Sequence, residues 1–162
     1  MEGGESADGM RPLHPNHVTL LRIRFALFAL ILLTAAVVGD VVVSRETGWP
    51  FGAISAAGLV LGLASVLVMP RRRYRAWRWR MDEDEIRIAS GVMISSDTVV
   101  PFGRVQHIDV LRGPLQRGLG LASLVLHTAG TRSAAVLLPG LDANEAERMR
   151  DHIRGKIREE LA

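Results

Sequence analysis

The chain has 162 residues, a hydrophobic fraction of 48% and a formal net charge of +3, which leaves room for two membrane helices and one small domain. Because it contains no cysteine, disulfides and thiolate metal sites are excluded. Acidic residues nearly match the basic ones, which cluster beside a hydrophobic segment, so we do not expect nucleic-acid binding.

Residues 1–21 form a predicted N-terminal leader. Residues 1–9 are rich in Gly, Glu, Ser and Asp, a composition typical of disorder. Residues 11–17 are interrupted by Pro12 and Pro15 and are not expected to be helical. We therefore expect a disordered, cytoplasmic leader that precedes the first folded element.

Two hydrophobic segments follow within residues 22–70, at 23–43 and 47–70. The second is uncharged and makes a helix of roughly 36 Å at about 1.5 Å per residue, enough to cross a hydrocarbon core of about 30 Å. A cleaved signal peptide is the competing interpretation of the first segment. It is disfavoured because no Ala-x-Ala site follows and a second span comes immediately after. We predict a two-helix transmembrane hairpin over residues 22–70.

Asp40 lies in the last turn of the first predicted span. A carboxylate at the bilayer centre costs about 3 kcal/mol and would indicate a proton or ion path. About one turn from the helix end it can reach headgroup water instead, so we expect an interfacial residue. An accessory subunit of a membrane transporter or enzyme, using Asp40, is the alternative function.

Arginines predict the orientation of the hairpin. Arg11, Arg22 and Arg24 precede the first span, and the connector between the spans holds only Arg45. The arginines after the second span are Arg71, Arg72, Arg73, Arg75, Arg78 and Arg80. Since positive charge concentrates on the cytoplasmic side, we expect a multi-pass protein of the inner (plasma) membrane with both termini in the cytoplasm.

The same six arginines can also attract anionic headgroups, at about 1 kcal/mol each. Membrane lipid is therefore an expected partner, and an anionic-lipid or envelope-stress sensor is an alternative function. In the second span, Gly58 and Gly62 form a GxxxG spacing that allows two helix backbones to approach closely. We favour packing against the first span of the same chain over a contact that builds a homo-oligomer.

Residues 71–162 change to short β-type segments separated by turn signals, which predicts an antiparallel sheet or small barrel. Strands are expected at 74–79, 86–88, 92–94, 98–100, 104–111, 124–128 and 134–138. A helix then closes the chain, with Asp142 and Glu145 as a capping box. Its apolar stripe consists of Ala146, Met149, Ile153, Ile157 and Leu161.

No catalytic, cofactor or metal site is expected from the side chains present. His107 and His127 lie on predicted strands and can approach each other, but a third ligand at meaningful spacing is missing. The acidic turn at 82–85 lacks the glycine and distal Glu of a calcium loop. Gly118 and Gly120 lead into a strand, whereas a dinucleotide fingerprint must open a helix. We expect a protein that is not an enzyme.

Residues 98–130, with a late Leu-Pro-Gly-Leu at 138–141, closely resemble the bacterial PH-like membrane proteins of the YdbS-like family. The shared marks are a Pro-x-x-Arg-Val/Ile-Gln-His strand, an Arg-x-x-Gly-Leu turn and a Thr-Ala-Gly hairpin, preceded by two membrane helices and an aromatic Tyr/Trp strand. The residues that carry the motif are Pro101, Arg104, Gln106, His107, Asp109, Pro114, Arg117 and Gly120.

This resemblance implies a pleckstrin-homology-like (PH-like) fold, in which a bent antiparallel sheet of about seven strands is capped by a C-terminal helix. It implies no known catalysis, and a partner that is a larger membrane protein with several such domains. Arg104, Gln106 and Asp109 are expected to tie strands together, and residues 114–120 to turn a corner. The four carboxylates at 82–85 replace a basic loop, so inositol-lipid recognition is not expected. The leading hypothesis is a membrane-anchored adaptor for protein–protein association at the cytoplasmic face.

Overall fold

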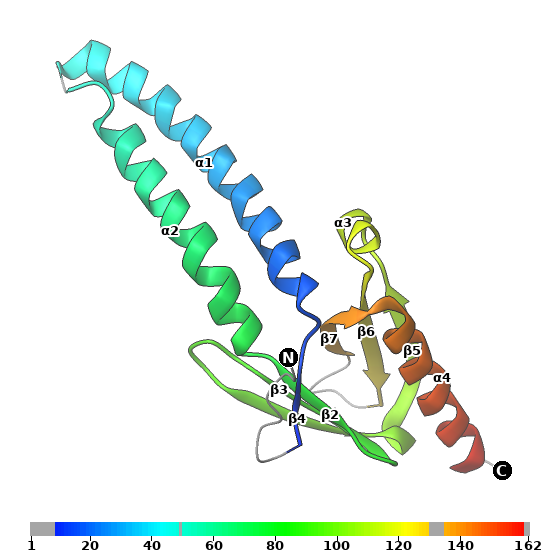
Figure 1. The fold of residues 1–162 in the computed structure, drawn as a ribbon. Coiled ribbons are helices and arrows are strands. Elements are labelled where there is room, and N and C mark those ends of the chain that lie inside the picture. The colour runs from blue at the N-terminus through cyan, green and yellow to red at the C-terminus, as the bar shows by residue number, and fades with distance from the viewer. Residues whose placement is uncertain (1–8, 49, 130–134, 161–162) are drawn as a thin grey trace. The chain divides into compact units, whose positions relative to one another are not determined.

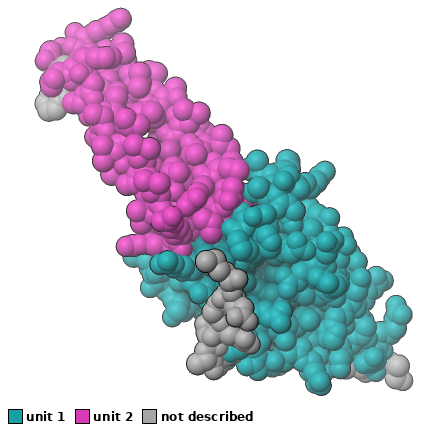
Figure 2. Space-filling model, in the orientation of Figure 1, with its two compact units in different colours: residues 1–17, 73–162 teal, residues 18–72 magenta. Residues whose placement is uncertain are grey.

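The computed structural model describes residues 9–48, 50–129 and 135–160 (Figure 1). The chain divides into two compact units, coloured separately in Figure 2: residues 18–72, and residues 1–17 together with 73–162. Residues 18–72 form the helical hairpin (unit 2, magenta), and residues 1–17 with 73–162 form the β-rich unit (unit 1, teal). Their boundaries fall a few residues outside the 22–70 predicted for the hairpin.

Two long helices, α1 (Asn16–Thr47) and α2 (Ala53–Arg75), make the hairpin. Both are long and apolar enough to cross a membrane. Many of their large apolar side chains are exposed, among them Ile31 and Leu61, a pattern suited to contact with lipid. α1 extends beyond the predicted 23–43 at both ends, whereas α2 begins at Ala53 rather than near residue 47. Gly52, with φ of +98°, adopts a conformation that a helix does not contain.

The predicted leader is shorter than expected. Arg11 and Pro12 form the short strand β1 (Arg11–Pro12), and Leu13 is buried in the core of the β-rich unit. The first turn of α1 already includes Asn16 and His17. Pro12 is compatible with β1 because an edge strand needs a hydrogen-bond partner on one side only. Residues 1–8 of the predicted leader lie outside the described residues.

The β-rich unit holds seven antiparallel strands in two sheets, followed by a C-terminal helix, as predicted. The first sheet has the order β1-β2-β3-β4 and the second β5-β6-β7. The remaining elements are β2 (Arg78–Met81), β3 (Glu85–Ser90), β4 (Ser96–Pro101), the 3-10 helix η1 (Phe102–Arg104), β5 (Val105–Leu111), α3 (Pro114–Gly118), β6 (Leu121–Thr128), β7 (Ala135–Asp142) and α4 (Ala143–Glu160).

Two predicted strands are wrong in detail. Tyr74 lies in the last turn of α2 rather than on a strand, and only the end of the predicted segment 74–79 reaches β2. Residues 92–94 form the loop between β3 and β4 instead of a strand. Gly91 opens this loop with φ of +136°, and a Cβ added there would lie 1.9 Å from the Ile94 carbonyl oxygen. The tight reversal therefore overrides the β propensity of the residues that follow.

The core lies between the two sheets and α4, which packs along the strands in Figure 1. Phe102 is fully buried beside residues from both sheets. The predicted stripe of α4 supplies Ala146, Met149 and Ile153 to this core, with Ile157 partly buried; Leu161 lies outside the described residues. Asp142 caps α4 by accepting hydrogen bonds from the amides of Asn144 at 2.9 Å and Glu145 at 3.3 Å.

Candidate functional site

The motif residues of β5 meet β6 around one carboxylate. Asp109 Oδ1 lies 2.9 Å from His107 Nε2, and Asp109 Oδ2 lies 3.1 Å from His127 Nε2. The two imidazole rings are 5.7 Å apart, so the expected approach of these histidines is present. Asp109 therefore ties β5 to β6. The arrangement holds two imidazoles and one carboxylate, and no group of three side chains placed to hold a metal ion occurs among the described residues.

Arg104 and Gln106 do not form the strand ties that we expected. Both side chains are exposed and make no hydrogen bond to another described residue, whereas the Arg104 carbonyl oxygen accepts from the Ala129 amide at 3.0 Å. Gln106 lies at a shift in the β5–β6 register, between Val105 and His107. A bulge of this kind redirects a side chain away from the ladder. Gln106 is thereby available at the surface.

The corner between β5 and β6 is held by residues that the motif only partly includes. Pro114 opens α3, and Gly120 precedes β6 with φ of +68°, a conformation that suits glycine. The buried Gln116 accepts from the Gly113 amide at 2.8 Å and donates to Ser123 Oγ at 2.9 Å. Sequence reasoning missed Gln116. A glutamine inside a turn-forming segment gives no signal of burial, because its partner lies on another element.

Two arginines complete this corner. Arg112 Nη2 donates to Glu147 Oε1 at 2.7 Å and to the Ala143 carbonyl oxygen at 3.1 Å, which joins the corner to α4. Arg117 Nε donates to the Arg112 carbonyl oxygen at 3.3 Å. The polar groups here hold one another, so the corner is structural.

A groove of about 360 Å³ runs between β5 and α4. Strand β5 forms one edge of its sheet, with β6 as its only neighbour among the described strands. Arg150 is paired with Asp151 at 2.8 Å, whereas Arg154 is exposed and has no ion-pair partner among the described residues. The lining residues are Gln106, His107, Ile108, Arg150, Arg154 and Ile157. The groove thus combines an open strand edge, an apolar floor and cationic side chains.

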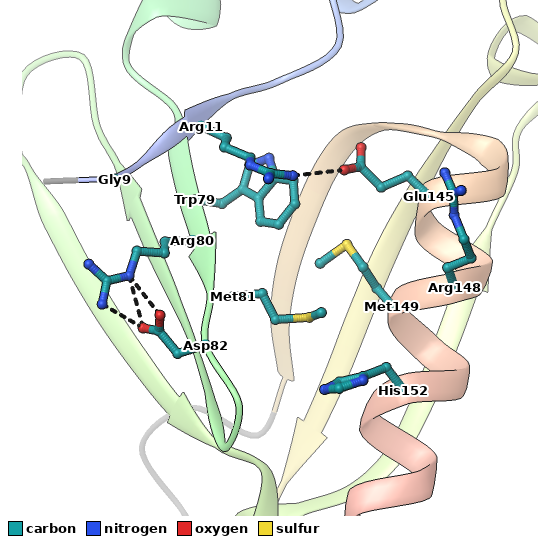
Figure 3. Close-up of a pocket in the computed structure, with 10 residues that line it drawn as sticks. All are labelled: Gly9, Arg11, Trp79, Arg80, Met81, Asp82, Glu145, Arg148, Met149 and His152. Carbon is teal, nitrogen blue, oxygen red and sulfur yellow. Dashed lines mark hydrogen bonds and ion pairs between the residues drawn. The ribbon is translucent and has the colours of Figure 1, made fainter. Parts of the chain in front are cut away.

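A second hollow, of about 690 Å³, lies between β2 and α4 and is drawn in Figure 3. The Arg11 guanidinium lies 6.0 Å from the centre of the Trp79 ring and 3.9 Å from the Glu145 carboxylate. On the other side, Arg80 is paired with Asp82 at 2.9 Å. Two carboxylates compensate Arg11 and Arg80, and Arg148 remains in the lining as a further cation.

The six arginines after the second span fall into two groups. Arg71, Arg72, Arg73 and Arg75 lie in the last turns of α2 and are exposed. Arg78 and Arg80 lie in β2 and are half-buried. Arg78 Nη1 donates to the Trp77 carbonyl oxygen at 3.0 Å, and Arg80 Nε donates to both Asp82 oxygens at 2.9 Å. Only the first group is exposed enough to meet headgroups.

Within the hairpin, Asp40 contacts the first turn of α2, and its expected depth near the membrane surface stays a prediction. Its side chain is buried and accepts hydrogen bonds from the amides of Ile54 at 3.3 Å and Ser55 at 2.7 Å, and from the Ser55 hydroxyl. These amides belong to the first turn of α2, where backbone N–H groups lack helical partners. Asp40 of α1 therefore caps α2.

Gly58 and Gly62 lie at the helix–helix contact inside the same hairpin. A Cβ added to Gly58 would lie 3.3 Å from Ala36 Cβ, and one added to Gly62 would lie 3.3 Å from Ala29 Cβ. Both alanines belong to α1. The close approach that GxxxG allows is thus used by the two helices of one chain.

Comparison with known proteins agrees with this architecture. A family model described as Bacterial PH domain matches residues 22–157. The UPF0699 transmembrane protein YdbS of Bacillus subtilis (strain 168) is 31% identical over 144 residues, which are 87% of this chain and 88% of that protein. The UPF0699 transmembrane protein YdbT of the same organism is 27% identical over 114 residues, 70% of this chain but 22% of that protein. No solved structure gives a significant match.

Proposed function

The chain belongs to the bacterial PH domain family, as a transmembrane protein similar to YdbS, and from this premise we propose that it is a membrane-anchored adaptor. In this proposal α1 and α2 hold the β-rich unit at the cytoplasmic face of the plasma membrane, with both chain termini in the cytoplasm. The β-rich unit then binds an acidic, extended segment of another membrane protein that carries PH-like domains.

The observation that carries this proposal is the groove between β5 and α4. An exposed strand edge presents unpaired N–H and C=O groups, to which an extended segment adds as a further strand. The Gln106 side chain, directed outward by the bulge, lies at the same edge. Arg154, exposed at the rim, favours a carboxylate on the incoming segment, and an Arg–carboxylate pair supplies orientation as well as attraction.

The relative YdbT supports the class of partner. The matched stretch is most of this chain but only 22% of that protein, so a similar module occurs there within a much longer transmembrane protein. A module that lies next to other domains within one long chain is suited to bind similar domains of a separate chain. This is the reason to look for a larger membrane protein with PH-like domains rather than for a soluble one.

The polar side chains support a role in binding rather than catalysis. The cluster of Asp109, His107 and His127 contains no hydroxyl, thiol or amine nucleophile, and its two histidines contact the same carboxylate rather than different partners. Catalysis by a nucleophile requires a base that is oriented by a third group toward that nucleophile. We therefore propose that the protein is not an enzyme and needs no cofactor.

Site-directed crosslinking in intact cells tests the adaptor role. A photoreactive amino acid replaces Gln106 in the groove, and the matched control replaces Val99, which is exposed on β4. We expect an adduct with a membrane protein at position 106 only, with the crosslinked peptide rich in Asp and Glu. Arg154→Glu should abolish the adduct, whereas Arg158→Glu, on the same helix but outside the groove, should retain it. An adduct between two copies would instead indicate a homo-oligomer, and recovery as a bare monomer would contradict the proposal.

The exposed arginines of α2 support a second function, the anionic-lipid or envelope-stress sensor. Arg71, Arg72 and Arg75 lie directly after an apolar span, where side chains reach the headgroup layer. If they recognise lipid, replacing them with serine should weaken retention of anionic lipid by the purified protein in a salt-dependent manner. Equal lipid retention by the variant and the natural chain would leave these residues with a role in topology only.

A further inference from the structure

The loop between β3 and β4 exposes three consecutive apolar side chains. Met93 is 97% exposed, Ile94 85% and Val92 47%. They form the tip of the β3–β4 hairpin, which we call the apolar tip and define as residues 92–94. Neighbouring positions carry only glycine or serine, up to Asp97, whose charge is balanced by Arg87 with Nε 3.0 Å from both carboxylate oxygens. Contiguous exposed apolar side chains mark a surface that meets a protein or a membrane.

The strand register places the apolar tip at the end of the sheet where the chain leaves the second span. β2 begins at Arg78, only three residues after α2 ends at Arg75, a distance of at most about 10 Å. Arg78 is paired with Ala89 near the end of the antiparallel β3. β2 therefore runs away from the end of α2 and β3 returns toward it, so the tip follows at that same end.

Residues 73–77, which follow the hairpin, are held within the β-rich unit. The Tyr74 hydroxyl donates to the Leu13 carbonyl oxygen at 2.8 Å, and Tyr74 and Trp77 pack against the hydrophobic core. Residues 73–162 all belong to this unit. The apolar tip thus keeps a set position relative to Arg73 and Arg75, which follow the apolar span and belong at the headgroup layer.

The negative charge of the same sheet is concentrated at the end far from the apolar tip, an arrangement that allows the tip to approach an anionic membrane surface. The acidic turn at 82–85 joins β2 to β3 at the opposite end of the hairpin from the apolar tip (Figure 1). β3 separates the two ends by roughly 20 Å, at about 3.3 Å per residue. An anionic leaflet repels carboxylates over about one Debye length, near 8 Å, so the acidic turn is far enough away not to oppose approach of the tip.

We propose that the apolar tip inserts into the inner leaflet of the membrane that α1 and α2 span. The tip would be the third point of attachment of the chain, beside the two spans, and it would fix the rotation of the β-rich unit about the end of α2. Its occupant is the headgroup and acyl boundary of the bilayer, where exposed apolar side chains settle about 5–10 Å deep. This site differs from the groove beside β5 and does not depend on the adaptor role.

The absence of cysteine from the chain permits a direct test with the full-length protein. Met93→Cys receives an environment-sensitive fluorophore, and Glu83→Cys, exposed in the acidic turn, is the matched control. Each variant is reconstituted as a single chain in nanodiscs of phosphatidylcholine and phosphatidylglycerol that carry nitroxide-labelled acyl chains. Because both positions are exposed, neither substitution should disturb the fold. We expect several-fold stronger quenching by the nitroxide at position 93 than at position 83, with iodide showing the reverse order.

Two further results show whether lipid, solvent or a second copy of the chain surrounds the apolar tip. Adding Val92→Ser and Ile94→Ser to the Met93→Cys variant should lower the nitroxide quenching toward that of the control, because the tip loses its apolar anchors. Equal access of iodide to both positions, without nitroxide quenching at 93, would overturn the proposal. Shielding of position 93 that arises only when two chains share a disc would also overturn it, since a second copy would then cover the tip.

Discussion

The carboxylate of Asp40 accepts hydrogen bonds from both the amide and the hydroxyl of Ser55, so a residue of α1 caps the first turn of α2. A helix ordinarily obtains its cap from the residue just before it. Here the connector ends in Gly52, which has no side chain to donate or accept, and the cap comes from the neighbouring helix. The same contact places the negative charge at the positive end of the helix dipole.

Replacing Asp40 with Ala should destabilise the hairpin by about 1 kcal/mol, the usual value of a lost N-cap. The amides of Ile54 and Ser55 should exchange faster with deuterium, while those in the middle of α2 should not change. Thr34→Ala, which removes another polar side chain of α1 without touching α2, is the control. If Asp40 instead lies on an ion path, Asp40→Asn would abolish transport while leaving exchange at these amides slow.

The two glycines of α2 should tolerate substitution poorly for a steric reason. Gly62→Leu places a large side chain where a Cβ alone would lie 3.3 Å from Ala29 Cβ, so the helices must separate. We expect a loss of about 1–3 kcal/mol, the range for overpacking. Gly39→Leu in α1 is the matched control, because a Cβ added at Gly39 would meet nothing within 4 Å. Unfolding in mixed detergent micelles measures both, and equal stability of the two variants would refute the contact.

Two glycines of the β-rich unit should respond to alanine in opposite directions. Gly140 has φ of +67°, and a Cβ there would lie 2.5 Å from His17 Cγ, so Gly140→Ala should cost at least about 1–2 kcal/mol. Gly155 lies inside α4 with nothing within 4 Å of its Cβ position. Gly155→Ala should therefore stabilise the protein by up to about 1 kcal/mol. Thermal unfolding followed by circular dichroism gives both changes, and a shift of the same sign would contradict the geometry.

The hydrogen bond from Arg87 lowers the pKa of Asp97 below its ordinary value. A depressed pKa in the folded state means that the ion pair stabilises the fold above about pH 3.9, the ordinary value for an unfolded chain. This contribution is lost as the pH falls through the lower folded pKa. Arg87→Met should return the pKa of Asp97 toward its ordinary value, as measured by NMR titration of the side-chain carboxyl carbon. An unchanged titration would show that the pair does not form in solution.

The general architecture could be predicted from the sequence because its signals are local. Long hydrophobic segments reveal the spans, and short β-branched segments between turns reveal the strands. Contacts between distant segments were harder to predict: the approach of His107 to His127 and the packing of Gly58 and Gly62 against the first span were expected, but most others were not. Asp40 was assigned to the interface because its depth can be counted along α1, whereas its bond to Ser55 depends on which turn of α2 lies beside it.

The apolar tip was also predicted wrongly, because its conformation depends on the backbone at Gly91 rather than on the β propensity of its residues. Val92 and Ile94 are β-branched and predict a strand. The backbone at Gly91 reverses the chain instead, and the side chains that would have filled a sheet face are left in solvent. The groove beside β5 was equally hidden, since Gln106 has the pattern of an ordinary strand residue and only the register shift directs it outward.

The arginines at the end of α2 should determine the orientation of the hairpin. Replacing Arg71, Arg72, Arg73 and Arg75 with serine removes the largest exposed positive cluster next to a span, while Arg78 and Arg80 keep their bonds within the β-rich unit. Because the bias of Lys and Arg between the two sides sets topology, we expect a mixed population in which part of the chains place this unit outside. A cysteine introduced at Glu83 reports orientation through labelling of intact cells by an impermeant maleimide. The parent Glu83→Cys chain should stay unlabelled until the cells are opened, whereas the serine variant should be partly labelled beforehand; labelling of the parent in intact cells would reverse the proposed topology.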